Sequence, residues 1–218
     1  KGVGVESIFV GNGSDEVIDL LFRAFCEPWK DWVIIMPPTY GMYQVSADIN
    51  AVRVVEVPLL EDFSVNLDKV LAARELSKMI FICSPNNPTG ESVSAEVIEA
   101  IADGYQGVVV VDEAYVDFSN QDSALRLLGR ENVVVVQTMS KAWGLAGIRL
   151  GVLYGNPEIV NVLNKIKPPY NVNAVTQRIA LEALKNKKQK EAWVKAVLLQ
   201  KEVLLLALQR IEWVLKVF

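Results

Sequence analysis

The chain has no histidine among its 218 residues. This absence excludes catalytic systems in which histidine activates serine or cysteine, and it leaves few ways to build a zinc site. Only two cysteines are present, Cys26 and Cys83, and both lie in apolar stretches. We therefore expect buried free thiols in a reducing cytoplasm rather than a disulfide. Any chemistry must use lysine, carboxylates, tyrosine or a cofactor.

The chain also lacks an excess of either charge and lacks long apolar runs. Its formal net charge is −4, with acidic and basic residues mixed along the sequence, whereas binding to nucleic acid or an anionic membrane needs a basic face. No apolar run reaches the ~18 residues that span a bilayer, and the first residues show no signal-peptide pattern. The sequence predicts a cytoplasmic globular protein with no nucleic-acid or membrane partner, and a hydrophobic content of 51% allows one sizeable core.

Runs of β-branched residues recur between helical patterns and predict strands. The runs are Val33 to Met36, Val52 to Val57, Met79 to Cys83, Val108 to Val111, Val133 to Val136 and Leu150 to Tyr154. Near-continuous valine and isoleucine indicate strands that are buried on both faces, as in a mostly parallel sheet covered by helices. The predicted fold class is therefore α/β, with a doubly wound sheet.

Four helices are predicted from apolar periodicity. Ser14 to Phe25 has Ser14 as a candidate N-cap, and Ser94 to Ala102 forms a second helix. After two prolines, Asn173 to Leu184 and Lys190 to Val217 are helical, with no further strand. We expect the long last helix to pack through its apolar residues. A boundary near residues 185–190 divides the chain into a domain of residues 1–187 and a helical segment of residues 188–218.

Distinctive residues follow several of the strands, where open α/β sheets bind ligands. A glycine turn, residues 11–13, leads into a helix N-terminus that suits a phosphate, although such turns are also ordinary structure. Residues 84–90, SPNNPTG, form a rigid turn that needs no function. Asp112 follows four valines, so burial would penalise its charge unless a strong donor meets it, and a helix cap is the alternative. Lys141, among small and apolar residues, is expected to be partly desolvated.

These motifs, in this order, resemble the fold-type I aminotransferases of the aspartate aminotransferase superfamily. Within it, the similarity is greatest to histidinol-phosphate aminotransferases, on the stretches GNGSDEVIDLLFRAF, PPTYGMYQVSADIN, SPNNPTG, DEAYVDFS, QTMSKAWGLAGIRLG and KPPYNVNAVTQ. The resemblance implies the large domain of a pyridoxal-phosphate-dependent transferase that forms a homodimer. It also implies a piece of a longer protein, without the N-terminal segment that reaches the partner subunit and with the C-terminal helices leading to a missing small domain.

The resemblance also implies a role for each matching residue. Lys141 would hold pyridoxal 5′-phosphate as a Schiff base and then act as the general base. The other implied contacts are Asp112 with the pyridine nitrogen, Tyr115 and Asn87 with the ring's 3′ oxygen, Tyr40 with the ring face, and Ser14, Asp15, Thr138, Ser140 and Arg149 with the phosphate.

The implied reaction transfers an amino group between glutamate and imidazole-acetol phosphate, giving 2-oxoglutarate and histidinol phosphate in histidine biosynthesis. Other enzymes share the same core, so a threonine-phosphate decarboxylase or another aminotransferase, such as an aromatic one, remains open. Transcription regulators that use this fold to sense ligands, and an inactive scaffold, are the alternatives outside catalysis.

Overall fold

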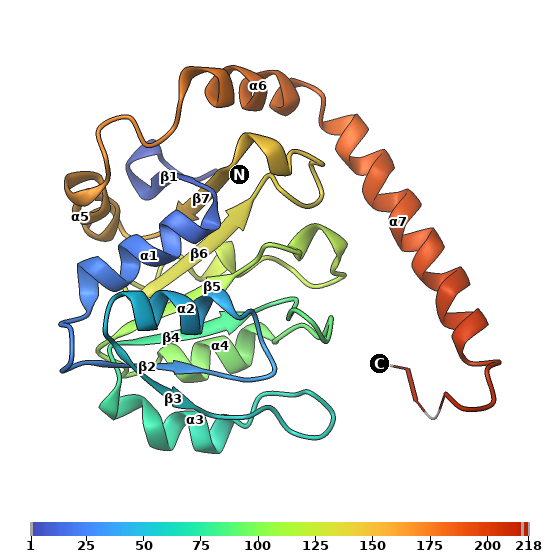
Figure 1. Ribbon diagram of the computed structural model, residues 1–218, viewed down its shortest axis with the longest axis horizontal. Helices are drawn as coiled ribbons and strands as arrows, with labels where there is room; N and C mark the ends of the chain where they lie inside the picture. The colour runs from blue at the N-terminus through green and yellow to red at the C-terminus, as the bar shows by residue number, and fades with distance from the viewer. Residues whose placement is uncertain (1, 215, 218) are drawn as a thin grey trace.

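The computed structural model describes residues 2–214 and 216–217, and a seven-stranded sheet forms the centre of this part of the chain (Figure 1). The strands are β1 (Ile8–Asn12), β2 (Trp32–Ile35), β3 (Arg53–Glu56), β4 (Met79–Cys83), β5 (Val108–Asp112), β6 (Val133–Thr138) and β7 (Leu150–Tyr154). Their order is β1-β7-β6-β5-β4-β2-β3. The pairs from β3 to β6 are parallel, whereas β7 is antiparallel to β6 and β1 to β7. The α/β class with a mostly parallel sheet is confirmed.

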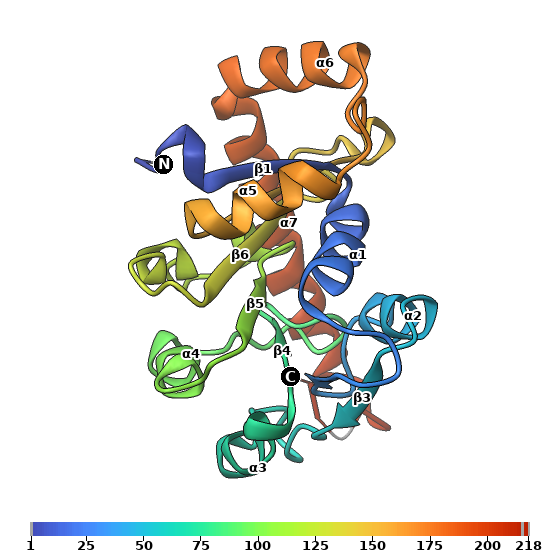
Figure 2. The same cartoon turned by 90° about the vertical axis from the view of Figure 1, so that its left-hand side faces the viewer.

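Helices cover both faces of the sheet (Figures 1 and 2). One face packs against α1 (Ser14–Phe25), α2 (Met42–Ile49) and α5 (Pro157–Ile166), and the other against α3 (Leu67–Ala73) and α4 (Ala95–Ala102). Side chains of β5 alternate between the two cores, with Val110 in the first and Val109 and Val111 in the second. Short 3-10 helices lie in the connections: η1 (Val5–Ser7), η2 (Arg74–Leu76), η3 (Val116–Phe118), η4 (Ala124–Leu127) and η5 (Ala146–Ile148).

The structure differs from the sequence predictions in several elements. All six predicted strands form, with ends displaced by no more than two residues, but β1 was not predicted, and neither were α2, α3 and α5. The assignment of Ser14 as the N-cap of α1 is wrong, because the helix begins at Ser14 and is preceded by Gly13. Gly13 has a φ of 84°, which glycine adopts readily. No side chain caps this end, so its N–H groups stay available to a ligand.

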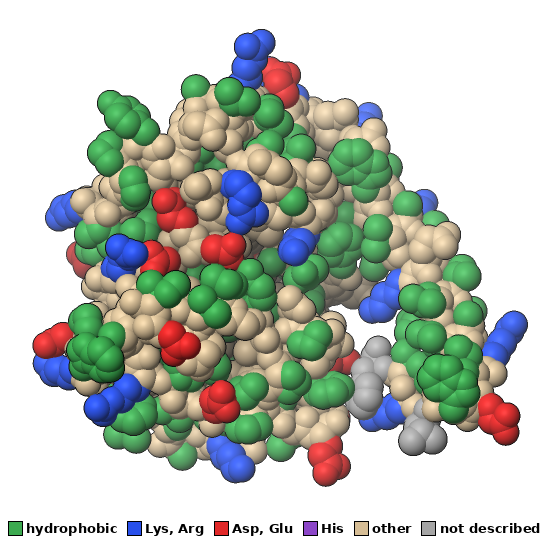
Figure 3. Space-filling view, viewed as in Figure 1, with side chains coloured by type: hydrophobic (Ala, Val, Ile, Leu, Met, Phe, Trp, Pro, Cys, Tyr) green, Lys and Arg blue, Asp and Glu red, His purple; other side chains and the backbone are tan. Residues whose placement is uncertain are grey.

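The C-terminal helices are α6 (Ala174–Lys185) and α7 (Lys187–Leu208), and the expected packing of the long helix is wrong. No residue of α7 is buried, and its apolar side chains, among them Trp193 and Val197, are about half exposed. Figures 1 and 3 show α7 leaning away from the body. The physical reason is that α1 to α5 already cover both faces of the sheet. The helix also ends at Leu208, short of its predicted end. The domain boundary near residue 187 stays a prediction.

The start of α7 is attached to the body by polar contacts. Nζ of Lys190 lies 2.5 Å from Oδ1 of Asp117, and it also lies 5.3 Å from the ring centroid of Trp143. Asp117 belongs to η3 and Trp143 follows Lys141 by two residues. The first turn of α7 therefore touches two loops that come from the sheet's carboxyl edge.

Cys26 and Cys83 are both free, as predicted, although Cys26 is only partly buried. Among the residues that the structure describes, no helix is long and apolar enough to cross a membrane.

Candidate active site

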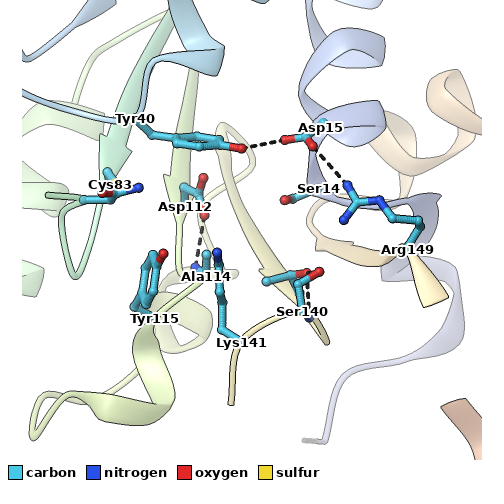
Figure 4. A pocket seen from close by; sticks show the side chains of 12 residues that line it. Ser14, Asp15, Tyr40, Cys83, Asp112, Ala114, Tyr115, Ser140, Lys141 and Arg149 are labelled. Atoms are coloured by element: carbon cyan, nitrogen blue, oxygen red, sulfur yellow. Dashed lines mark hydrogen bonds and ion pairs between the residues drawn. The ribbon is translucent and has the colours of Figure 1, made fainter. Parts of the chain in front are cut away.

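One pocket lies at the carboxyl ends of β4, β5 and β6, facing the first turn of α1 (Figure 4). The empty space within it is about 470 Å³, open solvent at its mouth included. It is lined by Ser14, Asp15, Tyr40, Cys83, Asn87, Asp112, Ala114, Tyr115, Thr138, Ser140, Lys141 and Arg149. All ten residues that the sequence singled out are in this set. The structure therefore brings together side chains from six separate stretches of the chain.

Asp112 is the last residue of β5 and lies at the floor of the pocket, with only 2% of its surface exposed. Oδ2 accepts a hydrogen bond of 2.8 Å from the hydroxyl of Tyr43, and Oδ1 accepts one of 3.0 Å from the backbone N–H of Ala114. Burial raises the pKa of Asp112 to about 6, although both hydrogen bonds act to lower it. The predicted strong donor is thus present, but it comes from tyrosine and backbone rather than from a cation of the chain.

Asp15 joins two other residues of the pocket. Its Oδ1 accepts a hydrogen bond of 2.9 Å from the hydroxyl of Tyr40, and its Oδ2 lies 3.1 Å from Nη2 of Arg149 (Figure 4). Burial, and then the bond to Asp15, raises the pKa of Tyr40 above its usual range, so its hydroxyl stays protonated. A carboxylate cannot donate to an anion. The side chain of Asp15 thus holds Tyr40 and Arg149 in place, and only its backbone N–H, in the first turn of α1, would be suited to donate to an anion.

Arg149 reaches the start of α1 because Gly13 and Gly151, two residues beside this contact, have no side chains. A Cβ on Gly13 would be 2.6 Å from Nη2 of Arg149, and a Cβ on Gly151 would be 2.4 Å from the backbone nitrogen of Ser14. Arg149 itself has left-handed backbone angles, φ 50° and ψ 64°. The chain thus brings a guanidinium next to the N-terminus of a twelve-residue helix, a combination that suits an anion.

Two hydroxyl groups complete this end of the pocket. Thr138 is the last residue of β6, and its Oγ1 donates to Leu150 O and accepts from the backbone N–H of Ser140 at 3.1 Å. Its Oγ1 also lies 3.0 Å from Oγ of Ser140. Because these contacts fix Thr138, the Ser140 hydroxyl beside Arg149 keeps a defined position.

Lys141 and Tyr115 face each other on the opposite side of the pocket (Figure 4). Nζ of Lys141 lies 5.1 Å from the centroid of the Tyr115 ring, close enough for a cation–π contact. The expected desolvation of Lys141 is wrong, because its side chain is exposed. The neighbouring small residues Ala142 and Gly144 do not cover it, so the amine is open to the pocket and to solvent.

Asn87 and Tyr40 lie in two loops, residues 84–90 and 37–40, that are joined by hydrogen bonds. The neighbouring Asn86 accepts from Oγ1 of Thr39 at 2.9 Å and donates to Pro38 O at 2.9 Å. These bonds hold residues 37–40 against residues 84–90. One of the two adjacent asparagines therefore fixes the loops, and the other lines the pocket.

Sequence reasoning did not identify Cys83, Ala114 and Tyr43. Cys83 ends β4, and burial, followed by the nearby charge of Asp112, raises the pKa of its thiol to about 12. It therefore stays a neutral thiol at the pocket wall. Ala114 contributes its backbone N–H. Tyr43, in the first turn of α2, carried no sequence signal that separated it from an ordinary core aromatic residue.

The comparisons with known proteins agree with this geometry. Residues 3–215 match the family "Aminotransferase class I and II". The histidinol-phosphate aminotransferase of Cytophaga hutchinsonii is 53% identical over 204 residues, covering 93% of this chain and 59% of the relative. Histidinol-phosphate aminotransferase of Sinorhizobium meliloti, solved in complex with pyridoxal-5′-phosphate, is 26% identical with a TM-score of 0.80 over 87% of this chain and 53% of that one.

A third match is a putative histidinol-phosphate aminotransferase from Erwinia carotovora atroseptica, 27% identical with a TM-score of 0.87 over 94% of this chain and 62% of that one. Fold and pocket thus define an α/β transferase core of the fold-type I class. The chain belongs to the aminotransferase class I and II family. It spans about 60% of the length of the curated relatives it matches.

Proposed function

We propose that the protein is a pyridoxal-phosphate-dependent aminotransferase that transfers an amino group between glutamate and imidazole-acetol phosphate, giving 2-oxoglutarate and histidinol phosphate. The observation that carries the proposal is the pocket, in which ten residues chosen from motifs of this family surround one cavity. Curated relatives that are about half identical to this chain are histidinol-phosphate aminotransferases, which supports the choice of substrates.

The side chains of the pocket fit pyridoxal 5′-phosphate. Arg149, Ser140 and the N-terminus of α1 offer a guanidinium, a hydroxyl and backbone N–H groups, which are the partners of a phosphate. Gly13 keeps open a space next to Arg149 that a Cβ would fill. Asp112 is a buried carboxylate that accepts hydrogen bonds from the Tyr43 hydroxyl and the backbone N–H of Ala114, and a protonated ring nitrogen would be a matching further donor.

In this proposal each residue has one task. The residues that hold the phosphate are Ser14, Asp15, Thr138, Ser140 and Arg149, those at the ring are Tyr40, Asn87, Asp112 and Tyr115, and Lys141 supplies the reactive amine. The cofactor supplies an aldehyde that condenses with amines and a ring that takes up electrons. Nζ of Lys141 removes the proton from the substrate's Cα, and its exposure on the pocket side lets it reach that atom. Asp112 keeps a negative charge beside the ring nitrogen.

An absorbance titration tests the proposal. Wild-type protein mixed with pyridoxal phosphate is expected to show a visible band that changes with pH and disappears after borohydride reduction, because the cofactor is bound through Nζ of Lys141. Lys141→Ala is expected to lose the band. Lys165→Ala, at an exposed position in the last turn of α5, is the matched control and keeps it.

Glutamate distinguishes the aminotransferase from its alternatives. Dialysis with excess glutamate converts the cofactor of an aminotransferase to its amine form and releases 2-oxoglutarate, whereas a ligand sensor leaves the band unchanged. Imidazole-acetol phosphate should then restore the band with formation of histidinol phosphate. No band in wild type would contradict the cofactor, and a band that glutamate does not alter would contradict the reaction.

The proposal extends to assembly and location. We infer a homodimer and a cytoplasmic protein from the family resemblance, and the two free thiols fit a reducing compartment. Sedimentation of the full-length protein tests the first inference, since a monomer at micromolar concentration would contradict it.

A further inference from the structure

Tyr43 is a fully buried side chain behind the pocket, and it does not line the cavity. It lies in the first turn of α2, and its hydroxyl crosses to β5, where it donates to Oδ2 of Asp112 at 2.8 Å. The two residues are 69 positions apart in the sequence. Burial first, and then the negative charge of Asp112, raises the pKa of Tyr43 well above its usual range, so the hydroxyl remains a donor at all physiological pH values.

The bond from Tyr43 determines how Asp112 presents its carboxylate. Oδ2 accepts a hydrogen bond from the Tyr43 hydroxyl, and Oδ1 accepts one from the backbone N–H of Ala114. A carboxylate has about four acceptor positions, so two donors fix its plane and leave acceptor positions toward the pocket. With the Ala114 bond alone, the carboxylate could rotate about a single contact. Tyr43 therefore supplies the second point that sets the orientation.

The ring of Tyr43 supports a second residue of the pocket. It stacks on Phe81 with centroids 4.8 Å apart, and Phe81 stacks on Phe22 at 5.3 Å. On its other side the edge of Tyr43 meets Tyr40 at 5.6 Å and 85°. An aromatic column thus runs from α1 through β4 to the ring that faces the cavity. Edge-to-face and offset stacked pairs of this kind hold ring orientation as well as burying area.

We propose that Tyr43 is a positioning residue for the cofactor, whose hydroxyl orients Asp112 toward the ring nitrogen and whose ring supports Tyr40 beside the ring face. This inference rests on the proposed function for the identity of the ligand. The role of Tyr43 toward Asp112 concerns the protein alone and can be measured without any ligand.

The test must account for every charged or titratable group that faces Asp112. Tyr43 comes from α2, Asp15 from α1, Cys83 from β4, and Glu113 is the next residue along the chain. Tyr40 and Lys141 face it from the loops around the pocket. Of these groups, Tyr43 donates a side-chain hydrogen bond of 2.8 Å to the carboxylate. Its removal should therefore raise the pKa of Asp112, while the other groups stay in place.

The variant is Tyr43→Phe, and Tyr105→Phe is a closely matched control. Tyr105 is also a buried tyrosine, and its hydroxyl bonds to Ser77 at 3.0 and 3.1 Å in the core on the other face of the sheet. Both variants lose one buried hydroxyl. Carboxyl ¹³C NMR of the cofactor-free protein, with Asp112 assigned from Asp112→Asn, should show titration near pH 6 in wild type and Tyr105→Phe. In Tyr43→Phe the midpoint should be higher by about 1 pH unit.

The second measurement is the affinity for pyridoxal phosphate at pH 7.5. Loss of a hydrogen bond to a charged acceptor should weaken binding about tenfold in Tyr43→Phe, equivalent to about 1.4 kcal/mol. Tyr105→Phe should bind as wild type does. If wild type binds no cofactor while Asp112 still titrates higher in Tyr43→Phe, the proposed function fails and the link between Tyr43 and Asp112 stands.

Two results would overturn the inference. One is an unchanged midpoint for Asp112 in Tyr43→Phe, and the other is a loss of cofactor affinity equal to that of Tyr105→Phe. Should Tyr43→Phe fail to fold, ¹³Cζ labelling of tyrosine in the wild type decides instead. The Tyr43 signal should then move with the midpoint of Asp112 and the Tyr105 signal should not; a Tyr43 signal that ignores that midpoint overturns the proposal.

Discussion

Asp112 and Glu113 are adjacent buried carboxylates in opposite situations. Asp112 has two donors and faces the pocket. Glu113 is 3% exposed, and its oxygens accept from Ala124 N, Ser123 Oγ and Gln137 Nε2 at 2.6 to 2.7 Å. A carboxylate that accepts three hydrogen bonds from its own chain has a structural role, whereas one with only two donors and a face toward the pocket is suited to a ligand. The motif DEAY does not indicate which of the two carboxylates binds a ligand, so their roles could be distinguished only from burial and hydrogen bonding in the structure.

The raised pKa of Asp112 predicts a pH dependence of stability in the cofactor-free protein. Since its folded-state pKa is about 6 and its ordinary value is 3.8, folding takes up a proton between these values, and Asp112 lowers stability as pH rises through this window. Asp112→Asn lacks this proton uptake. Its free energy of unfolding relative to wild type should therefore increase by about 2 kcal/mol from pH 4 to pH 7. Urea unfolding at each pH measures the difference, and a constant difference would contradict the raised pKa.

At the scale of elements, the strands were predictable because their apolar runs are continuous. β4 and β7 were predicted to the residue, and β5 and β6 failed only at their last residues, Asp112, Gln137 and Thr138. These residues are polar because Asp112 and Thr138 line the pocket and Gln137 donates to Glu113. β1 was missed because IFVGN contains glycine and asparagine at its end. The sequence signal weakens at the positions where strands meet the site.

The missed helices have a similar explanation. α2 and α3 are only eight and seven residues long, too short for a clear apolar period. α5 did have a signal, because Asn156 caps it and Pro157 occupies its first turn. All predicted site residues reached the pocket because family motifs specified them. Tyr43 and Cys83 were missed because an aromatic ring and a thiol inside apolar patterns look like ordinary core.

We expect the hydrogen bonds of Glu113 to hold η4 against the end of β6. It joins Gln137 at the end of β6 to Ser123 and Ala124 at the start of η4. Glu113→Ala leaves buried donors without partners and should lower the free energy of unfolding by about 3 kcal/mol. Glu131→Ala, at an exposed position, should change it by less than about 0.5 kcal/mol. Thermal denaturation of both variants checks this. Equal losses would show that Glu113 is not an anchor.

At the scale of the whole molecule, the chain consists of an α/β body, in which helices cover both faces of the sheet, and α7, which makes few contacts with that body. The body has one core on each face of the sheet, and every residue that lines the candidate active site belongs to it. Apart from the contacts of its first turns, α7 exposes its apolar side chains. Composition could not reveal this, because the helical pattern of residues 190–208 has the same apolar content whether or not a partner covers it.

This division predicts two different responses to the cofactor. Amides in β4 and β5 should exchange only when the body unfolds, whereas amides of residues 198–208 in α7 should exchange through local opening, because their side chains are mostly exposed. Pyridoxal phosphate at 100 times its Kd binds the folded body and stabilises it by about 2.7 kcal/mol. Hydrogen exchange in β4 and β5 should then slow about a hundredfold, while exchange in residues 198–208 stays unchanged. Lys141→Ala at the same cofactor concentration is the control and should show a smaller effect in the sheet. Equal slowing of the sheet and the helix would mean that α7 unfolds with the body, and that its exposed face does not make it an independent unit.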